Sequence, residues 1–327
     1  MTTIRYLAFT GGIGGAKLGL GLSKILGADE LAFVVNTGDD FEHLGLHVSP
    51  DIDTLVYTLA GQSNLQTGWG RSDETWTFMS ALEALGGETW FKLGDKDLAM
   101  NVERSWRLAA GQNLTIVTGE LAAALGVTHQ IMPMSDDAIR TVVRTEHGDL
   151  DFQHYFVRDK CKPVVTGFEF KGAEEASLPA MLGECLRSDE LAGIILCPSN
   201  PFVSIDPILA VPGLREALRK CRAPVIAVSP LVGGQAIKGP TVKMMQEMAI
   251  PNTATWVAGH YADFLSGFIL DSQDAESIAD IEQLGITSHA TQTVMSTLDD
   301  RVQLARDCLE FVSRLSQSQQ ATTRLGE

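Results

Sequence analysis

Residues 4–37 constrain the fold most, because two buried strands there enclose a glycine-rich turn and a helix. Residues 4–10 (IRYLAFT) and 31–37 (LAFVVNT) are apolar on both faces, as strands of a parallel sheet tend to be. The segment GGIGGAK follows the first strand and leads into an apolar-periodic helix over 18–26. A strand, a helix and a strand in this order form a right-handed βαβ unit. The sequence therefore predicts an α/β protein.

The alternation of helices and strands continues along the chain. Helical patterns cover 50–61, 74–86 and 97–111, and residues 113–132 indicate a further helix and strand. Beyond residue 189, strands ending in loops (GIILCPSNP and APVIAVSP) flank another helix, and the last 55 residues are predicted to be mostly helical. This order predicts a doubly wound, mostly parallel, Rossmann-like sheet.

The pattern changes in the middle of the chain. Residues 141–157 alternate apolar and polar side chains around a glycine-containing turn, which is typical of an antiparallel hairpin, and residues 164–172 can add a strand. We therefore predict a small α+β insertion at 138–188 within a nucleotide-binding core formed by 1–137 and 189–327.

Charge and cysteine content restrict the partners and the compartment. The net charge of −16 repels nucleic acid and anionic membranes, so we expect neither as a partner. The five cysteines include no CxxC pair, which favours reduced thiols. No apolar run approaches the roughly 20 residues of a membrane span. We expect a cytoplasmic protein.

Small, polar and glycine residues recur where the predicted strands end, which is where parallel sheets bind ligands. The first such loop opens a helix, whose N-terminal N–H groups attract phosphate. The alternative is that the glycines serve packing alone, since the full dinucleotide fingerprint and the Walker A context are both missing. Likewise, Lys17 either neutralises phosphate or is an exposed helix lysine. The candidate nucleotide- and phosphate-binding residues are Thr10, Gly11, Gly12, Gly14, Gly15, Lys17, Asn36, Ser199, Asn200 and Ser229.

Carboxylates follow the second strand. Asp39, Asp40, Asp51 and Asp53 lie within fifteen residues of one another, and hard oxygen ligands of this kind suit Mg²⁺. We take Asp39 and Asp51 as candidate metal ligands. Asp53 is the candidate catalytic residue, because a carboxylate there can accept the proton of an attacking hydroxyl. The alternative is that Ser49 or Asp51 simply caps a helix.

Further candidates lie in the next stretch of sequence. Lys92, in FKLGDKD, either contacts phosphate or an acidic heterocycle or belongs to a solvated turn. Trp69, Trp76 and Trp90 can flank a flat ring, although tryptophans are more often core residues. The histidines show no metal-binding spacing, and no G-x-S-x-G elbow supports acyl hydrolysis.

Several of these strings together resemble the CofD/FbiA family, the 2-phospho-L-lactate transferases of coenzyme F420 biosynthesis. The matching segments run in family order and are FTGGIGGAKL, VVNTGDD, HVSPDIDTLVY, FKLGDKDLA, IMPMSDD, CPSNPFVSIDPIL, AVSPLVGGQAIKGP and TVMST. The resemblance implies transfer of a phosphorylated C3 acid from a GDP-linked donor to the terminal ribityl hydroxyl of the deazaflavin Fo, with release of GMP.

The same resemblance implies Mg²⁺ as cofactor, a homodimer, and Fo bound near Asp53 and Lys92. The glycine loop departs from the GGTGTPKL form of archaeal members, because Ile13 and Gly15-Ala16 stand where threonines and proline occur. Backbone amides must then replace a threonine hydroxyl at the phosphate. The acid remains open among phospholactate, phosphoenolpyruvate and phosphoglycerate.

Two other functions compete with the transferase. A related family binds nucleotide sugars such as UDP-GlcNAc and acts as a regulator, but SPDIDT, KLGDKD and PSNP favour the transferase. An NAD-dependent oxidoreductase is disfavoured, because Asn36-Thr37-Gly38 ends the second strand where an acid that binds ribose is expected.

Overall fold

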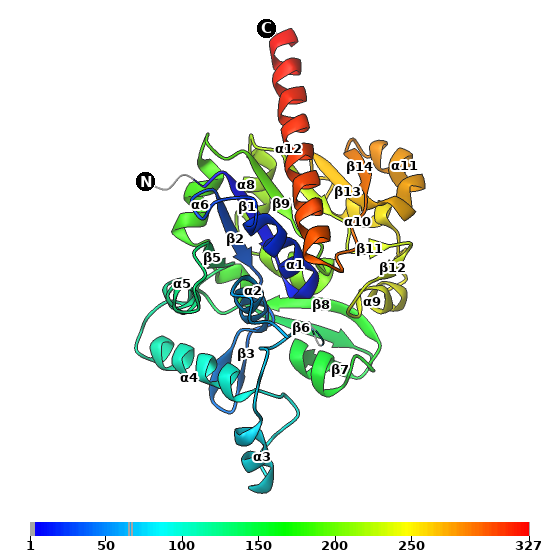
Figure 1. Ribbon diagram of the computed structural model, residues 1–327. Helices are drawn as coiled ribbons and strands as arrows, with labels where there is room; N and C mark the ends of the chain where they lie inside the picture. The colour runs from blue at the N-terminus through cyan, green and yellow to red at the C-terminus, as the bar shows by residue number, and fades with distance from the viewer. Residues whose placement is uncertain (1–3, 65, 67, 327) are drawn as a thin grey trace.

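A parallel sheet of seven strands forms the centre of the molecule (Figure 1). The computed structural model describes residues 4–64, 66 and 68–326. The strands lie in the order β14-β13-β10-β9-β1-β2-β5, so the chain winds outward in both directions from β1 and β9. Their bounds are β1 (Tyr6–Thr10), β2 (Leu31–Val35), β5 (Gln130–Pro133), β9 (Gly193–Leu196), β10 (Val225–Val228), β13 (Gly267–Asp271) and β14 (Thr287–Thr291). The predicted doubly wound fold is confirmed.

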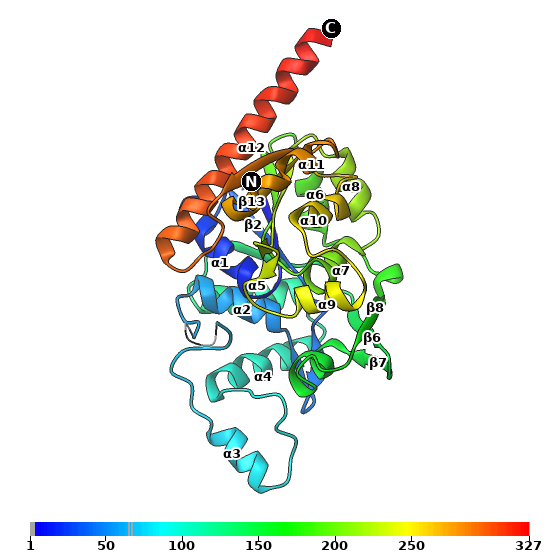
Figure 2. The ribbon, with the colours of Figure 1, turned by 90° about the vertical axis from the view of Figure 1, so that its right-hand side faces the viewer.

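Helices cover both faces of this sheet (Figures 1 and 2). Within β1, Ala8 points into one hydrophobic core, whereas Leu7 and Phe9 point into the other. The first core is closed by α1 (Gly12–Ser23), α2 (Pro50–Leu59), α5 (Leu114–Ala124) and α12 (Leu298–Gly326). The second is closed by α6 (Ala180–Arg187), α8 (Leu214–Lys220), α9 (Thr241–Glu247), α10 (Ala254–His260) and α11 (Ile278–Glu282). Burial on both faces explains why the strands are continuously apolar.

The segment predicted as an insertion contains a separate antiparallel sheet. Its strand order is β7-β6-β8, with β6 (Arg140–Thr145), β7 (Gly148–Asp151) and β8 (Val165–Lys171). A short helical segment, η1 (His154–Arg158), follows β7. Val143 and Tyr155 of this segment are buried in the same core as Leu7. The small sheet therefore packs onto the hydrophobic core beside the central sheet rather than folding around a core of its own.

Several boundaries differ from the sequence-based expectation. Helix α1 begins at Gly12, so the glycine segment forms a helical turn rather than a loop. Helix α4 (Asp95–Ala109) begins inside KLGDKD, and α3 is Thr77–Ala84. The hairpin of β3 (Phe41–His43) and β4 (Leu46–Val48) and the edge strand β14 carry too little apolar pattern to be recognised. The remaining short elements are η2 (Ala173–Glu175), η3 (Pro201–Ile205), α7 (Asp206–Leu209), β11 (Leu231–Val232), β12 (Gln235–Ala236) and η4 (Ser272–Ser277).

Close packing of α1 against α12 depends on one glycine. A Cβ on Gly21 would overlap the backbone carbonyl of Arg301, which cannot rotate away as a flexible side chain does.

Within the described chain, no helix, α12 included, is long and apolar enough to cross a membrane.

We predict that Gly21→Ala lowers the free energy of unfolding by about 1–3 kcal/mol, the usual cost of overpacking a core. Urea denaturation measures this change. Gly119→Ala in α5 is the matched control, because its Cβ would meet no atom within 4 Å and alanine favours helix. A Gly21→Ala protein as stable as the wild type would contradict the packing described.

Candidate active site

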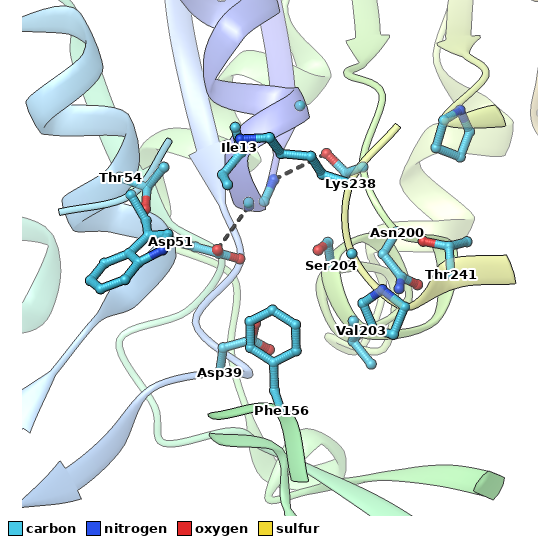
Figure 3. A pocket seen from close by; sticks show the side chains of 18 of the residues that line it. Ile13, Asp39, Asp51, Thr54, Phe156, Asn200, Val203, Ser204, Lys238 and Thr241 are labelled. Atoms are coloured by element: carbon cyan, nitrogen blue, oxygen red, sulfur yellow. Dashed lines mark hydrogen bonds between the residues drawn. The ribbon is translucent and has the colours of Figure 1, made fainter. Parts of the chain in front are cut away.

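A pocket of about 600 Å³ lies at the carboxyl ends of the parallel strands (Figure 3). It opens where the strand order reverses, between β1 and β9, which is the ligand-binding position in doubly wound sheets. Its walls come from the first turn of α1, the start of α2, the loops after β9, β10 and β14, residues 90–92, and the segment after β7. Residues far apart in the sequence thus surround one cavity.

The glycines of the first turn have two different roles. A Cβ on Gly14 would overlap the carbonyl oxygen of Pro198, and one on Gly15 would overlap the hydroxyl of Thr10. These two glycines let α1 pack closely against its neighbours. This is the packing role that the sequence allows as the alternative to phosphate binding. Gly12 differs, because its φ is +64° and a Cβ would meet no atom within 4 Å. No side chain would therefore limit access to the backbone at Gly12, although its N–H already donates to Asp51 Oδ1.

The N-terminus of α1 provides the electrostatic attraction for an anion. First-turn N–H groups have no acceptor within their own helix, and α1 carries no acidic residue in its first turn. The Gly12 N–H donates to Asp51 Oδ1 at 2.8 Å, and the Gly11 N–H donates to Ser199 Oγ at 3.3 Å. Ile13 and Gly14 also line the pocket, so their backbone is placed beside the cavity.

Asn36 holds the acidic side of the pocket in place. Its Nδ2 donates to Asp51 Oδ2 at 2.9 Å and to the carbonyl of Val203 at 3.1 Å, while its Oδ1 accepts from the Gly38 N–H at 2.8 Å. Asn36 is fully buried and is not among the residues that line the cavity. The structure therefore places this predicted ligand contact behind Asp51.

Asp39 and Asp51 both line the pocket. Burial raises the pKa of Asp39 well above its usual value, and the neighbouring Asp51 carboxylate raises it further. Burial likewise raises the pKa of Asp51 to about 6, despite the hydrogen bonds from Asn36 and Gly12. Asp39 Oδ1 is buried without a hydrogen-bond partner. Two buried carboxylates that face one cavity are poorly compensated, and a cation would stabilise both.

These two residues fit a divalent cation held jointly with a phosphate ligand. Among the described residues, no group of three or more His, Cys, Asp or Glu side chains could hold a metal alone. Mg²⁺ binds in this shared way, since it commonly takes one or two carboxylates together with substrate phosphates and water. The donor set at Asp39 and Asp51 thus suits Mg²⁺.

Asp53 is not among the residues that line the pocket, although Asp51 and Thr54 on the same helix are. Both of its oxygens accept from the guanidinium of Arg104, Oδ2 at 3.1 Å, and the Arg104 side chain is fully buried. Burial raises the pKa of Asp53, and Arg104 opposes that effect. One turn further along α2, Tyr57 donates to Asp97 Oδ1 at 2.7 Å. Burial, followed by the charge of Asp53, raises the pKa of Asp97 to about 7.

Lysines line the pocket in a chain whose net charge is −16. Lys17 Nζ donates to the Met295 carbonyl at 2.8 Å, so the alternative of an exposed helix lysine is wrong. Burial lowers the pKa of Lys17, and the nearby charges of Arg301 and Lys238 lower it further. Lys92 also lines the cavity, as do Lys160 and Lys238. Lys160 has no sequence motif to mark it, and Lys238 lies in the segment AVSPLVGGQAIKGP but is not among the predicted site residues.

Aromatic side chains form the wall opposite the α1 turn. Phe156 stacks on Phe152 at a centroid distance of 5.4 Å and lines the pocket with it (Figure 3). Trp90 also lines the cavity and packs against His43 and His154. Of the other two tryptophans proposed to flank a flat ring, Trp69 lines the pocket and Trp76 does not. The two phenylalanines lack any local signal in the sequence.

The polar residues after β9 and β10 shape their loops. Asn200 Oδ1 accepts from the Phe202 N–H at 3.0 Å, which caps the segment that contains Ser204. The Ser229 hydroxyl both accepts from the Leu231 N–H at 3.1 Å and donates to the Leu231 carbonyl at 3.0 Å. Ser199, Asn200 and Ser229 line the cavity, whereas Thr10 and Gly15 lie behind it.

The sequence matches the family described as "2-phospho-L-lactate transferase CofD" over residues 7–304. It is 37% identical to a phosphoenolpyruvate transferase from Streptomyces griseus subsp. griseus, over 95% of this chain and 99% of that protein. It is 36% identical to a 2-phospho-L-lactate transferase from Methanosarcina mazei, over 91% of this chain and 97% of the relative. The fold is similar to that of a UPF0052 family protein from Bacillus halodurans, with a TM-score of 0.61, 13% identity, and coverage of 94% of this chain and 99% of that one.

The buried ion pair of Asp53 and Arg104 gives a stability prediction. Arg104→Met should lower the free energy of unfolding by about 3–5 kcal/mol, because it leaves Asp53 buried without its partner. Thermal or urea unfolding measures the loss. Arg107→Met is the control, since its partners Glu103 and Glu120 are exposed and surface pairs contribute about 0–1 kcal/mol. Equal losses for the two variants would show that Arg104 does not stabilise a buried charge.

Proposed function

Because the chain belongs to the 2-phospho-L-lactate transferase CofD family, we propose that it moves a phosphorylated C3 acid from a GDP-linked donor to the ribityl hydroxyl of Fo. The products are GMP and a phosphodiester of coenzyme F420 biosynthesis. The observation that carries this proposal is one pocket that joins an open helix N-terminus to two buried carboxylates and an aromatic wall. These parts suit a diphosphate, its metal and a flat acceptor respectively.

The acid is one of three candidates: phospholactate, phosphoenolpyruvate or phosphoglycerate. The relative from Methanosarcina mazei, at 36% identity, is named for phospholactate. The relative from Streptomyces griseus subsp. griseus, at 37% identity, is named for phosphoenolpyruvate. Ile13 lines the pocket beside the donor phosphates in our proposal and provides no hydroxyl. Backbone amides of the α1 turn then bind the phosphate that carries the acid.

Attack of an alcohol on a diphosphate depends on positioning and charge neutralisation more than on covalent catalysis. In our proposal the α1 turn and Lys17 bind the diphosphate, and Asp39 and Asp51 hold Mg²⁺. When bound, the metal would neutralise phosphate charge as a Lewis acid. The aromatic wall and Lys92 orient the ring of Fo, so that its hydroxyl chain points toward the acidic side.

Asp53 is the proposed proton acceptor and an Fo contact. Its neighbours Pro50 and Thr54 line the pocket, whereas Asp53 itself does not. The role requires the Asp53–Arg104 pair to open toward the cavity once the hydroxyl is bound. Arg104 favours the charged form of Asp53, the form that can accept a proton.

We further propose a cytoplasmic homodimer that binds small molecules, neither nucleic acid nor membrane. The acidic net charge supports the lack of nucleic acid and anionic lipid partners. The cysteines are all free in the structure, as thiols in a reducing compartment are. Sedimentation equilibrium of the purified protein measures the oligomeric state.

The transfer reaction is tested by incubating the protein with Fo, Mg²⁺ and each of three donors, in which GDP is linked to one of the candidate acids. We expect GMP and a charged deazaflavin, detected by mass, with at least one donor. Chelation of Mg²⁺ should stop the reaction, and re-addition should restore it. No turnover with any donor, together with tight binding of a UDP-sugar, would instead favour the nucleotide-sugar-binding regulator.

The role of Asp53 is tested by Asp53→Asn. We predict a fall in the transfer rate of about 100-fold or more, because the amide cannot accept the proton. Near-ultraviolet circular dichroism checks that the variant stays folded. Asp136→Asn is the control, since Asp136 is exposed, lies outside the pocket lining and accepts a hydrogen bond from the Thr115 N–H. A wild-type rate for Asp53→Asn would remove the residue from the mechanism.

A further inference from the structure

One buried amide of the pocket wall makes no hydrogen bond within the described protein. Gln153 lines the cavity and is only 5% exposed. It stands at the start of η1, but its side chain does not cap that segment, and no other partner of the side chain is found among the described residues. Buried amides are normally paired, because a desolvated group with an unmade hydrogen bond costs free energy. A ligand in the cavity can supply the missing partner.

The segment around Gln153 forms one wall of the cavity. The residues of this segment that line the cavity recur four positions apart, about one helical turn, and are Phe152, Phe156 and Lys160 in one row and Gln153 and Val157 in the other. The rings of Phe152 and Phe156 are stacked, with an angle of 9° between their planes. Figure 3 shows Phe156 at the end of the pocket that also holds Asp39. The amide of Gln153 thus belongs to an aromatic wall.

The backbone of this wall is fixed by its winding and by its anchor in the core. The Asp159 N–H donates to the carbonyl of His154, five residues earlier, at 2.9 Å, so η1 is wound as a π-helix. Such turns are rare and frequently occur at functional sites. Tyr155 of the same turn is fully buried in the core, and Lys160 then takes a φ of +54°, which is uncommon for a residue with a Cβ. The side chain of Gln153 is therefore presented from an ordered backbone, which limits the entropy lost on binding.

The chemistry of an amide selects among the ligands of the proposed reaction. A glutamine side chain offers N–H donors and a carbonyl acceptor in one plane. A diphosphate presents acceptors, which would leave the carbonyl of Gln153 unpaired. An imide presents an N–H between two carbonyls, and the ring of a deazaflavin such as Fo carries this group. Guanine has a similar edge, so position decides between the two: Gln153 lies in the aromatic wall, opposite the α1 turn where we place the phosphates of the nucleotide.

We propose that Gln153 recognises the acceptor by pairing with the imide edge of its ring. The Gln153 Nε2 donates to a ring carbonyl, and its Oε1 accepts from the imide N–H. Phe156 contacts the face of the ring, so that the ring is held both in its plane and across it. This pairing fixes which way the hydroxyl chain of the acceptor points. The inference rests on the proposed transferase function and names a residue that determines its acceptor specificity.

The test combines a variant of the full-length protein with a change in the ligand. Gln153→Met removes the amide and keeps the length of the side chain. Gln112→Met is the matched control, because Gln112 is exposed and lies outside the pocket lining. Calorimetry measures the binding of Fo, of Fo methylated on its imide nitrogen, and of GMP to each protein. Steady-state assays with the accepted donor give the KM for Fo and the KM for the donor.

We expect Gln153→Met to weaken the binding of Fo by about 10- to 100-fold, because the imide is then desolvated without its partner. Methylation of the imide should weaken binding to the wild type to a similar degree and change binding to Gln153→Met much less. The KM for Fo should rise, while the affinity for GMP and the KM for the donor stay unchanged. Gln153→Glu, which keeps an acceptor and loses the N–H donors, replaces the methionine variant if that variant does not fold.

Wild-type affinity of Gln153→Met for Fo would overturn the inference and leave the transferase function standing. An equal effect of imide methylation on both proteins would also overturn it, because the imide would then contact another group. Loss of GMP binding in Gln153→Met would do the same, since the amide would then serve the nucleotide. A wild-type protein that binds neither Fo nor GMP and turns over no donor would instead overturn the proposed function itself.

Discussion

The hydrogen bond from the Gly12 N–H to Asp51 joins the two elements on which the whole site depends. It ties the N-terminus of α1, where the helix dipole favours anions, to the start of α2, which carries Asp51. Asn36 fixes the other oxygen of Asp51 from the end of β2. The turn that we propose to bind phosphate and the acid that we propose to bind a cation are thereby held side by side at the point where the strand order reverses.

The pocket is rich in positively charged side chains, although the net charge of the chain is strongly negative. The protein carries a net charge of −16, yet four lysines, Lys17, Lys92, Lys160 and Lys238, line the cavity. Asp39 and Asp51 are buried there, and burial raises the pKa of both. This arrangement stores unfavourable electrostatic energy in the free protein, which a metal and a polyanionic substrate would relieve together.

The sequence predicts the sheet and its ligand-binding edge, because buried parallel strands and glycine turns are local patterns. The sequence also identifies four candidate residues that line the pocket, namely Gly12, Asp39, Asp51 and Lys92. It does not reveal Arg104 as the partner of Asp53, or Phe156 and Lys160 in the pocket wall, because their positions follow from tertiary packing alone. The strand β14 escapes recognition because it is half-exposed at the sheet edge and short of apolar residues.

The central claim is that α1 and the Asp39–Asp51 pair bind one diphosphate and its metal together. A crystal structure with GDP and Mn²⁺, in which anomalous scattering locates the metal, tests it most directly. We predict the terminal phosphate at the N-terminus of α1 beside Gly12, with the metal bridging it to Asp39 and Asp51. A nucleotide bound away from α1, or a metal that contacts neither carboxylate, would contradict the account.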